Sequence, residues 1–141
     1  MQPPRGFTLF EVTITLCILG ILSAIAMPSA RALIDRIHVH GAVMEIESLF
    51  SSARHIAIAR STQATVEIDP LARAIYVMVG ADTVRKGEVG ANHDVLLSAS
   101  RVRMSYAATG MGYGAANLSV FVQRSSSADT VFVSRLGRLR H

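Results

Sequence analysis

Cysteine and lysine are almost absent from this chain. Cys17 is the only cysteine, so no disulfide can form within the chain and the folded part must rely on its core alone. Cys17 lies inside an apolar run, where a lone thiol acts as a small hydrophobic side chain facing lipid or a neighbouring helix. Lys86 is the only lysine among 14 cationic side chains, which leaves 13 arginines. Arginine suits two-point contacts with phosphate and carboxylate groups.

Charge is nearly missing from the first 30 residues. The run from Phe7 to Met27 is 21 residues long and contains one charged side chain, Glu11. A bilayer core of about 30 Å needs roughly 20 apolar residues in a helix, so this run is long enough to cross it. A carboxylate inside such a segment costs about 2.5–3.5 kcal/mol to insert, which makes Glu11 a candidate functional residue.

Two other interpretations of this run stay open. A secretory signal peptide has a basic region, an apolar core and a small-residue cleavage site, which Ala24-Ile25-Ala26 resembles. Its basic region would be Arg5 alone, however, and the run is long for a signal core. A plain single-pass anchor would explain the length of the run but gives no reason for Glu11.

The length of the chain limits the folded part to one domain. The chain has 141 residues, and about 110 of them follow the apolar run, enough for one domain. We expect residues 1–6 to form a leader, 7–28 a transmembrane helix, 29–60 its amphipathic continuation and 61–141 a β domain.

Helical periodicity continues beyond the apolar run. Apolar residues recur at spacings of three and four after Pro28, which predicts an amphipathic stripe that packs against a sheet. The stripe consists of Val39, Val43, Ile46, Phe50, Ala53 and Ala57, and the opposite side carries Arg36, His40, Glu47, Ser51 and Arg54. We therefore expect one helix from about Thr8 to Ala59, bent but not ended at Pro28.

Beyond Arg60 the period changes to two, which predicts strands. The expected strands are 64–68, 74–79, 95–97, 101–106, 118–123 and 130–136, with hairpin turns at 69–72 and 124–127. The polar stretch 82–94 is predicted to be a mobile loop. The fold class is therefore α+β, with a long N-terminal helix packed on a small antiparallel β-sheet domain.

Sequence motifs for catalysis or for metal or cofactor binding are not found. The glycine-rich stretch 110–114 is not a GxGxxG motif, and no helix pattern follows it, so a turn or bulge is a better interpretation than a phosphate loop. His38 and His40 are two residues apart and point in different directions on a helix, unlike a metal pair. We therefore expect no enzyme, no metal site and no cofactor.

The second candidate site is the basic C-terminus. The formal net charge is +4, and the excess gathers in the last seven residues, which include Arg135, Arg138, Arg140 and His141. A strand is predicted to run into Gly137, so that Arg138 and Arg140 alternate onto one side. Two guanidinium groups on one face can bind phosphates, although a charged chain end is often simply solvated.

The N-terminus resembles that of type IV prepilins and type II secretion pseudopilins. In that family a short leader ends in glycine, the mature chain begins with phenylalanine and its fifth residue is glutamate, as at Gly6, Phe7 and Glu11. Pro28 stands where many members carry a helix-kinking proline, while Phe10 replaces the commoner Ile, Leu or Val. The resemblance implies that prepilin peptidase cleaves the Gly6–Phe7 bond and methylates the Phe7 nitrogen. It also implies that Glu11 helps to set subunit register by pairing with a neighbour's amine.

The C-terminal Gly-Arg-Leu-Arg sequence resembles the ending shared by H-type pseudopilins and FimT minor pilins, the GspH/FimT group. The implied function is that of a minor pseudopilin or pilin subunit, assembled into a type II secretion pseudopilus or related type IV filament and supporting protein secretion. The alternative is a FimT-type minor pilin that binds DNA for uptake in natural transformation, through Arg135, Arg138, Arg140 and also Arg124.

The same resemblance implies a location and partners. Basic residues flank both ends of the apolar run, so charge alone does not decide the orientation. Family members keep the leader in the cytoplasm, span the inner membrane once and hold the C-terminal domain in the periplasm until the subunit enters a filament. The implied partners are prepilin peptidase, other pilin or pseudopilin subunits, the inner-membrane assembly platform, membrane lipid and, in the alternative, DNA.

Overall fold

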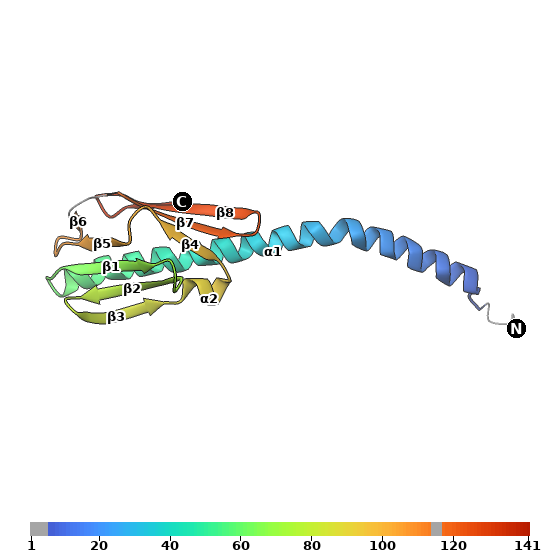
Figure 1. Cartoon of the computed structure of the whole chain (residues 1–141), viewed down its shortest axis with the longest axis horizontal. Helices are drawn as coiled ribbons and strands as arrows, with labels where there is room; N and C mark the ends of the chain where they lie inside the picture. Colours follow the sequence, from blue (N-terminus) through green and yellow to red (C-terminus); the bar gives the residue numbers. More distant parts are fainter. Residues whose placement is uncertain (1–5, 114–116) are drawn as a thin grey trace, which may run out of the picture. The chain divides into compact units, whose positions relative to one another are not determined.

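The computed structural model describes residues 6–113 and 117–141. Arg5 and Gly114, both singled out above, lie outside the described residues. The chain divides into two compact units, residues up to Ile34 and Asp35–His141. In chain order the elements are α1 (Leu9–Ala59), β1 (Ala64–Asp69), β2 (Ala74–Val79), β3 (Asp82–Gly87), α2 (Val89–His93), β4 (Leu96–Ala99), β5 (Arg103–Tyr106), β6 (Gly112–Tyr113), β7 (Leu118–Arg124), β8 (Ser127–Val133) and β9 (Leu139–Arg140) (Figure 1).

The long helix α1 begins at Leu9 and ends at Ala59, which confirms the predicted span to within one residue. Pro28 lies inside α1 and does not end it. A proline in a helix interior removes one hydrogen bond and costs about 3 kcal/mol or more. Apolar flanks offset that cost, because a backbone in lipid can satisfy its polar groups only by remaining helical.

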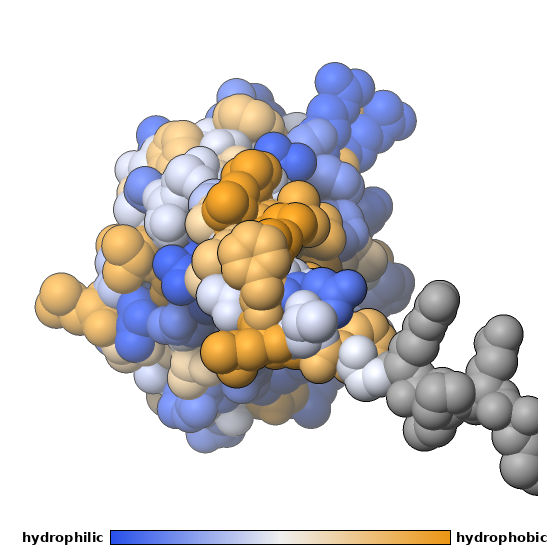
Figure 2. Space-filling view, turned by 90° about the vertical axis from the view of Figure 1, so that its right-hand side faces the viewer, coloured by the Kyte–Doolittle hydropathy of each residue, from blue (hydrophilic) through white to orange (hydrophobic). Residues whose placement is uncertain are grey.

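In its described residues, 6–34, the first unit is helical from Leu9 onward and has no buried residue. Every side chain from Phe7 to Arg31 is exposed within the chain, and Figure 2 shows hydrophobic side chains gathered over the start of α1. The helix is long and apolar enough to cross a membrane. Apolar surface left in water costs roughly 25 cal/mol per Å², so the composition of this segment fits membrane anchoring.

The second unit has a hydrophobic core shared by α1 and two antiparallel sheets. The first sheet has the strand order β3-β2-β1-β5-β6 and the second the order β4-β7-β8-β9. All six residues of the predicted helical stripe are buried, together with Ala42 and Leu49. The core cluster joins these side chains to residues of both sheets. The predicted α+β class is confirmed, but the strands form two sheets where one was expected.

The predicted hairpins are present with shifted ends. Strand β1 pairs with β2 over six residues, and β7 pairs with β8 over seven. The strands expected at 95–97 and 101–106 correspond to β4 and β5, which lie in different sheets. Sequence spacing locates both of these strands, but the sheet that each one joins depends on partners far along the chain.

The prediction of a mobile loop over residues 82–94 is wrong, because this segment forms β3 and α2. The glycines of this segment allow close packing and do not make the segment mobile. A Cβ on Gly87 would stand 2.4 Å from Leu49 Cδ1, and a Cβ on Gly90 would stand 2.2 Å from Arg73 Cβ. Only glycine allows the backbone to approach its neighbours so closely.

The prediction that the last long strand runs into Gly137 is also wrong. Strand β8 ends at Val133, and a backbone hydrogen bond of 2.9 Å between Ser134 N and Arg138 O closes a turn. Gly137 adopts a φ of +71° within this turn, a left-handed conformation that favours glycine. The chain then reverses into β9, which lies antiparallel to β8.

Tyr106 supports this turn from the core. Its side chain is 1% exposed, and a Cβ on Gly137 would stand 3.2 Å from Tyr106 Cε1. Burial disfavours the charged phenolate and raises the pKa of Tyr106 to about 12, although the nearby Arg54 guanidinium partly offsets the effect.

We expect the free energy of unfolding to decrease between pH 10 and pH 12. A tyrosine in the unfolded chain loses its proton near pH 10, whereas folded Tyr106 keeps it up to about pH 12. Alkaline pH therefore favours the unfolded state, by roughly 2 kcal/mol at pH 12. Denaturant unfolding of the detergent-solubilised chain, followed by circular dichroism, should show a smaller decrease for Tyr106→Phe. Equal pH slopes in both chains would contradict this account.

Candidate functional site

The peptide bond between Gly6 and Phe7 lies in an accessible segment. Neither residue belongs to a helix or a strand, and the Phe7 side chain is exposed. A Cβ on Gly6 would meet no atom within 4 Å. Proteolytic cleavage favours exposed segments of this kind, so the fold leaves this bond open to a peptidase.

Thr8 and Glu11 form a capping box at the first turn of α1. Glu11 N–H donates to Thr8 Oγ1 at 3.2 Å, and Thr8 N–H donates to Glu11 Oε2 at 2.8 Å. The Thr8 hydroxyl also donates to Glu11 Oε2 at 2.8 Å. This reciprocal arrangement satisfies two backbone donors that the helix itself leaves open. The Thr-x-x-Glu pattern of a capping box is present in the sequence. From the sequence, Glu11 was considered only as a partner for a neighbouring subunit, and so this cap was not predicted.

The Glu11 carboxylate stands beside an apolar hollow of about 240 Å³ lined by Phe7, Glu11, Val12, Thr15 and Leu16. Within residues 6–113 and 117–141, no cationic side chain lies within 4 Å of it. The helix N-terminus itself favours a negative charge here. A carboxylate with two or more acceptor positions still unused can take a cationic donor from outside the chain.

The structure separates the residues predicted to act in assembly. Phe7 and Glu11 share the hollow at the head of α1. Pro28 lies exposed on the same helix, roughly 25 Å farther along its axis at 1.5 Å per residue. Any role of Pro28 is therefore separate from the contacts of Glu11.

Arg138 and Arg140 line one surface groove of about 550 Å³. Arg140 lies opposite Phe132 in the pairing of β8 with β9, and exposed Phe132 and Leu136 give the groove apolar walls. The two arginines thus border the same groove. The turn at Gly137 brings them there, whereas the sequence suggested a continuous strand.

Arg135 lies outside this groove, although its side chain is also exposed. Its carbonyl accepts a hydrogen bond of 2.9 Å from Gly112 N–H, which ties β6 to the turn. A Cβ on Gly137 would stand 3.1 Å from Gly110 O. The glycine-rich segment and the C-terminal turn therefore pack directly on one another, as a turn between strands rather than a phosphate loop.

Arg124 does not join the basic groove, contrary to the suggestion from the sequence. Its Nε donates to Asp35 Oδ1 at 2.9 Å, and its Nη1 donates to the His93 carbonyl at 2.9 Å. The side chain is largely buried in this network. Arg124 therefore holds the turn between β7 and β8 against α1 and α2.

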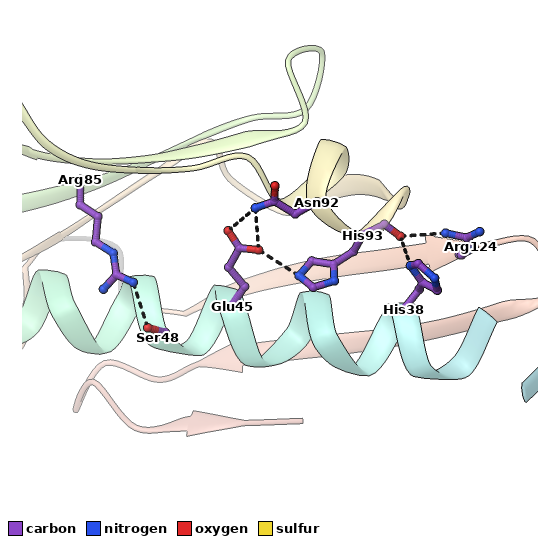
Figure 3. Close-up of polar contacts among 7 residues, drawn as sticks. All are labelled: His38, Glu45, Ser48, Arg85, Asn92, His93 and Arg124. Carbon is purple, nitrogen blue, oxygen red and sulfur yellow. Dashed lines mark hydrogen bonds and ion pairs between the residues drawn. The ribbon is translucent and has the colours of Figure 1, made fainter. Parts of the chain in front are cut away.

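Two histidines complete the network around α2 (Figure 3). His93 Nε2 bonds to Glu45 Oε2 at 2.9 Å, and Asn92 Nδ2 donates to the same carboxylate at 3.1 Å. His38 Nδ1 lies 2.9 Å from the His93 carbonyl. Because a carbonyl only accepts hydrogen bonds, His38 carries a proton on Nδ1. Sequence reasoning missed this role, since 55 residues separate the partners.

Comparison with known proteins agrees with the N-terminal features. Residues 1–27 match the family described as the prokaryotic N-terminal methylation motif. Two proteins of Pseudomonas aeruginosa named "Fimbrial protein" are each 42% identical to this chain over 53 residues, which is 38% of this chain and 34% of the relative. The chain thus matches about a third of the length of these relatives.

Two solved structures share the fold. The type IV minor pilin FimU of Pseudomonas aeruginosa superposes with a TM-score of 0.63 at 13% identity, over 74% of this chain and 88% of FimU. The minor pseudopilin EpsH of the Vibrio cholerae type 2 secretion system gives a TM-score of 0.56 at 11% identity, over 73% of this chain and 94% of EpsH. This chain therefore combines a match to the prokaryotic N-terminal methylation motif over residues 1–27 with a fold similar to that of these minor pilins and pseudopilins.

Proposed function

We propose that this chain is a minor subunit of a type II secretion pseudopilus or related type IV filament and that it supports protein secretion. The observation that carries the proposal is the exposed Gly6–Phe7 bond directly ahead of the capped start of an uncovered apolar helix. An apolar segment whose side chains are all exposed, as they are from Phe7 to Arg31, needs lipid first and other helices later. The proposed role is assembly rather than catalysis.

The proposed route begins in the inner membrane. Prepilin peptidase cleaves after Gly6 on the cytoplasmic side and methylates the new amine of Phe7, while Asp35–His141 folds in the periplasm. The capping box survives this cleavage, because both of its members follow the cut. The inner-membrane assembly platform then moves the mature subunit from lipid into the filament.

Glu11 acts during that last step. Within the described residues of the single subunit, Thr8 supplies the hydrogen bonds to the Glu11 carboxylate. The methylated amine of a neighbour's first residue would add a charge-assisted hydrogen bond, which is about twice as strong as a neutral one. When the subunit moves from lipid into a stack of helices, this bond favours the register in which the neighbour's amine meets the Glu11 carboxylate. Pro28 allows α1 to bend and so to fit against its neighbours.

Cleavage between Gly6 and Phe7 is the first expected outcome. Mass spectrometry of the protein extracted from membranes should find a chain that starts at N-methylated Phe7. Retention of Met1, or a new start after Ala26, would rule out the prepilin route and favour a plain anchor or a signal peptide.

Charge and capping by Glu11 can be separated with two variants. Glu11→Gln keeps a side-chain oxygen for Thr8 N–H but loses the charge, whereas Thr8→Val removes the hydroxyl and keeps the charge. We expect Glu11→Gln and Glu11→Ala to be processed and inserted normally yet to be depleted from purified filaments. Thr8→Val should lose about 1 kcal/mol of helix-start stability but still assemble. If Glu11→Gln assembles like the wild type, the charge of Glu11 is not needed for assembly and capping is the role that is left.

DNA binding for uptake in natural transformation is a second candidate function, favoured by the groove that holds Arg138 and Arg140. Two guanidinium groups in one groove bind phosphates without reading bases. Such binding would be independent of sequence and strongly dependent on salt. Arg135 is exposed nearby in sequence and would add to the local positive charge.

Titration of duplex DNA at several salt concentrations tests this second function. Arg138→Ala combined with Arg140→Ala should weaken binding by the detergent-solubilised chain. It should also flatten the slope of log affinity against log salt by roughly 1.8, at about 0.9 for each lost phosphate contact. Arg60→Ala with Arg101→Ala removes two exposed charges elsewhere and should change the slope much less. If the wild-type chain shows no DNA affinity at low salt, only the secretion role stands.

A further inference from the structure

The outer faces of the two sheets differ in chemistry. On the first sheet, Thr65 Oγ1 and Ser105 Oγ are hydrogen-bonded at 2.9 Å, and Arg103 Nη2 donates to Glu67 Oε2 at 2.7 Å. These neighbouring polar pairs suit a face that stays in water. The outer face of the second sheet instead presents large apolar side chains to solvent.

Leu96, Phe121 and Phe132, termed here the diagonal patch, cross the second sheet from β4 through β7 to β8. Phe121 lies opposite Ser98 and Phe132 opposite Ser119, so each member of the patch stands one diagonal step from the next. Diagonal neighbours on one sheet face are about 7–8 Å apart, within reach of large side chains. The three side chains are 62%, 45% and 53% exposed, and nothing in the described chain covers them.

Hollows adjoin the diagonal patch at both of its ends. A hollow of about 450 Å³ is lined by Leu96 and Phe121, and the basic groove of about 550 Å³ is lined by Phe132. Arg140 stands directly opposite Phe132. The patch therefore begins as an apolar surface and ends at the guanidinium groups of Arg138 and Arg140.

The carboxylates of the folded unit are not placed to neutralise those arginines. Within residues 6–113 and 117–141, no carboxylate side chain lies within 4 Å of Arg135, Arg138 or Arg140. The carboxylates already held by a hydrogen bond or ion pair are Asp35, Glu45, Glu47, Glu67, Asp69, Glu88, Asp94 and Asp129. A second copy of this chain would therefore present mainly carboxylates that already hold a hydrogen bond or an ion pair. A partner with complementary charge has to supply acidic side chains of its own.

We propose that the diagonal patch, with Arg138 and Arg140 at its end, docks the acidic face of a different protein subunit in the same filament. Aromatic and arginine side chains are the types enriched at the energetic centres of protein interfaces. The patch supplies the apolar centre of the interface, and the arginines supply the charge that selects the partner. This inference rests on the proposed filament role and adds the chemistry of the partner.

Nucleic acid covers this surface less completely. Its phosphates would reach Arg138 and Arg140, but a duplex exposes mainly charged phosphates and polar base edges and has little apolar surface to place over Leu96. Bases of a single strand stack on aromatic rings, whereas Leu96 and Leu136 present no flat face for stacking. A protein surface with apolar and acidic parts covers the whole patch.

Site-specific photo-crosslinking in cells that assemble the filament tests the proposal. One full-length chain carries a photoreactive phenylalanine analogue in place of Phe132, and a control chain carries it in place of Leu71, which is 96% exposed in the turn between β1 and β2. We expect the probe at position 132 to form one nuclease-resistant crosslink. Mass spectrometry should identify its partner as a membrane-anchored filament subunit with an acidic folded domain. The probe at position 71 should form no such crosslink.

Charge reversal tests the second part of the interface. Arg138→Glu with Arg140→Glu should reduce the crosslinked fraction about tenfold, the size of effect expected for interface hot spots. Arg60→Glu with Arg101→Glu reverses two other exposed charges and should leave the fraction unchanged.

The other outcomes each overturn the proposal. These are a crosslink to nucleic acid, a crosslink to a second copy of this chain, equal crosslinking from positions 71 and 132, or an unchanged crosslink after charge reversal at Arg138 and Arg140. No crosslink from a chain that is processed after Gly6 and present in filaments overturns the docking surface alone. An unprocessed chain outside filaments overturns the proposed function as well, and mass spectrometry of the same samples distinguishes the two failures.

Discussion

A single helix has to satisfy two environments, and the rest of the structure depends on how it does so. From Leu9 to Met27 the side chains of α1 are apolar on nearly every side, which suits lipid. From Val39 to Ala57 the buried side chains form one face, which suits a protein core. Backbone hydrogen bonding is the same in both parts, so α1 continues through Pro28. The two sheets fold around the second part, and the first part stays available to lipid and to other helices.

Much of this arrangement could be predicted because it follows from the local spacing of apolar residues. The limits of α1, the burial of its stripe and the β1–β2 hairpin follow from spacings of three, four and two residues. The segment 82–94 could not be predicted in this way. Its strand exists because β2 pairs with it, and Gly87 fits there because Leu49 leaves no room for a side chain. Both causes are contacts between residues distant in sequence.

The candidate sites also differ in whether they depend on residues close together in the sequence or on contacts between distant residues. The site at the start of α1 could be predicted from the sequence because its members lie within a few residues of one another: the Gly6–Phe7 junction, Thr8 and Glu11. The grouping of Arg138 with Arg140 was suggested by their spacing, but the turn that achieves it depends on the positive φ of Gly137. Arg124 looked like another surface cation. It is engaged with Asp35, 89 residues away, and only the fold reveals that contact.

The buried face of α1 also determines how the folded unit bears load. Val39 and Ala57, the first and last buried residues of this face, are roughly 27 Å apart along the helix axis at 1.5 Å per residue. A pull transmitted along α1 from the membrane side acts parallel to this face. The contacts of Val39, Ile46, Phe50 and Ala57 are then strained together in shear, and they do not peel apart one after another. Extraction of the helix along its axis would therefore have to break these contacts at the same time.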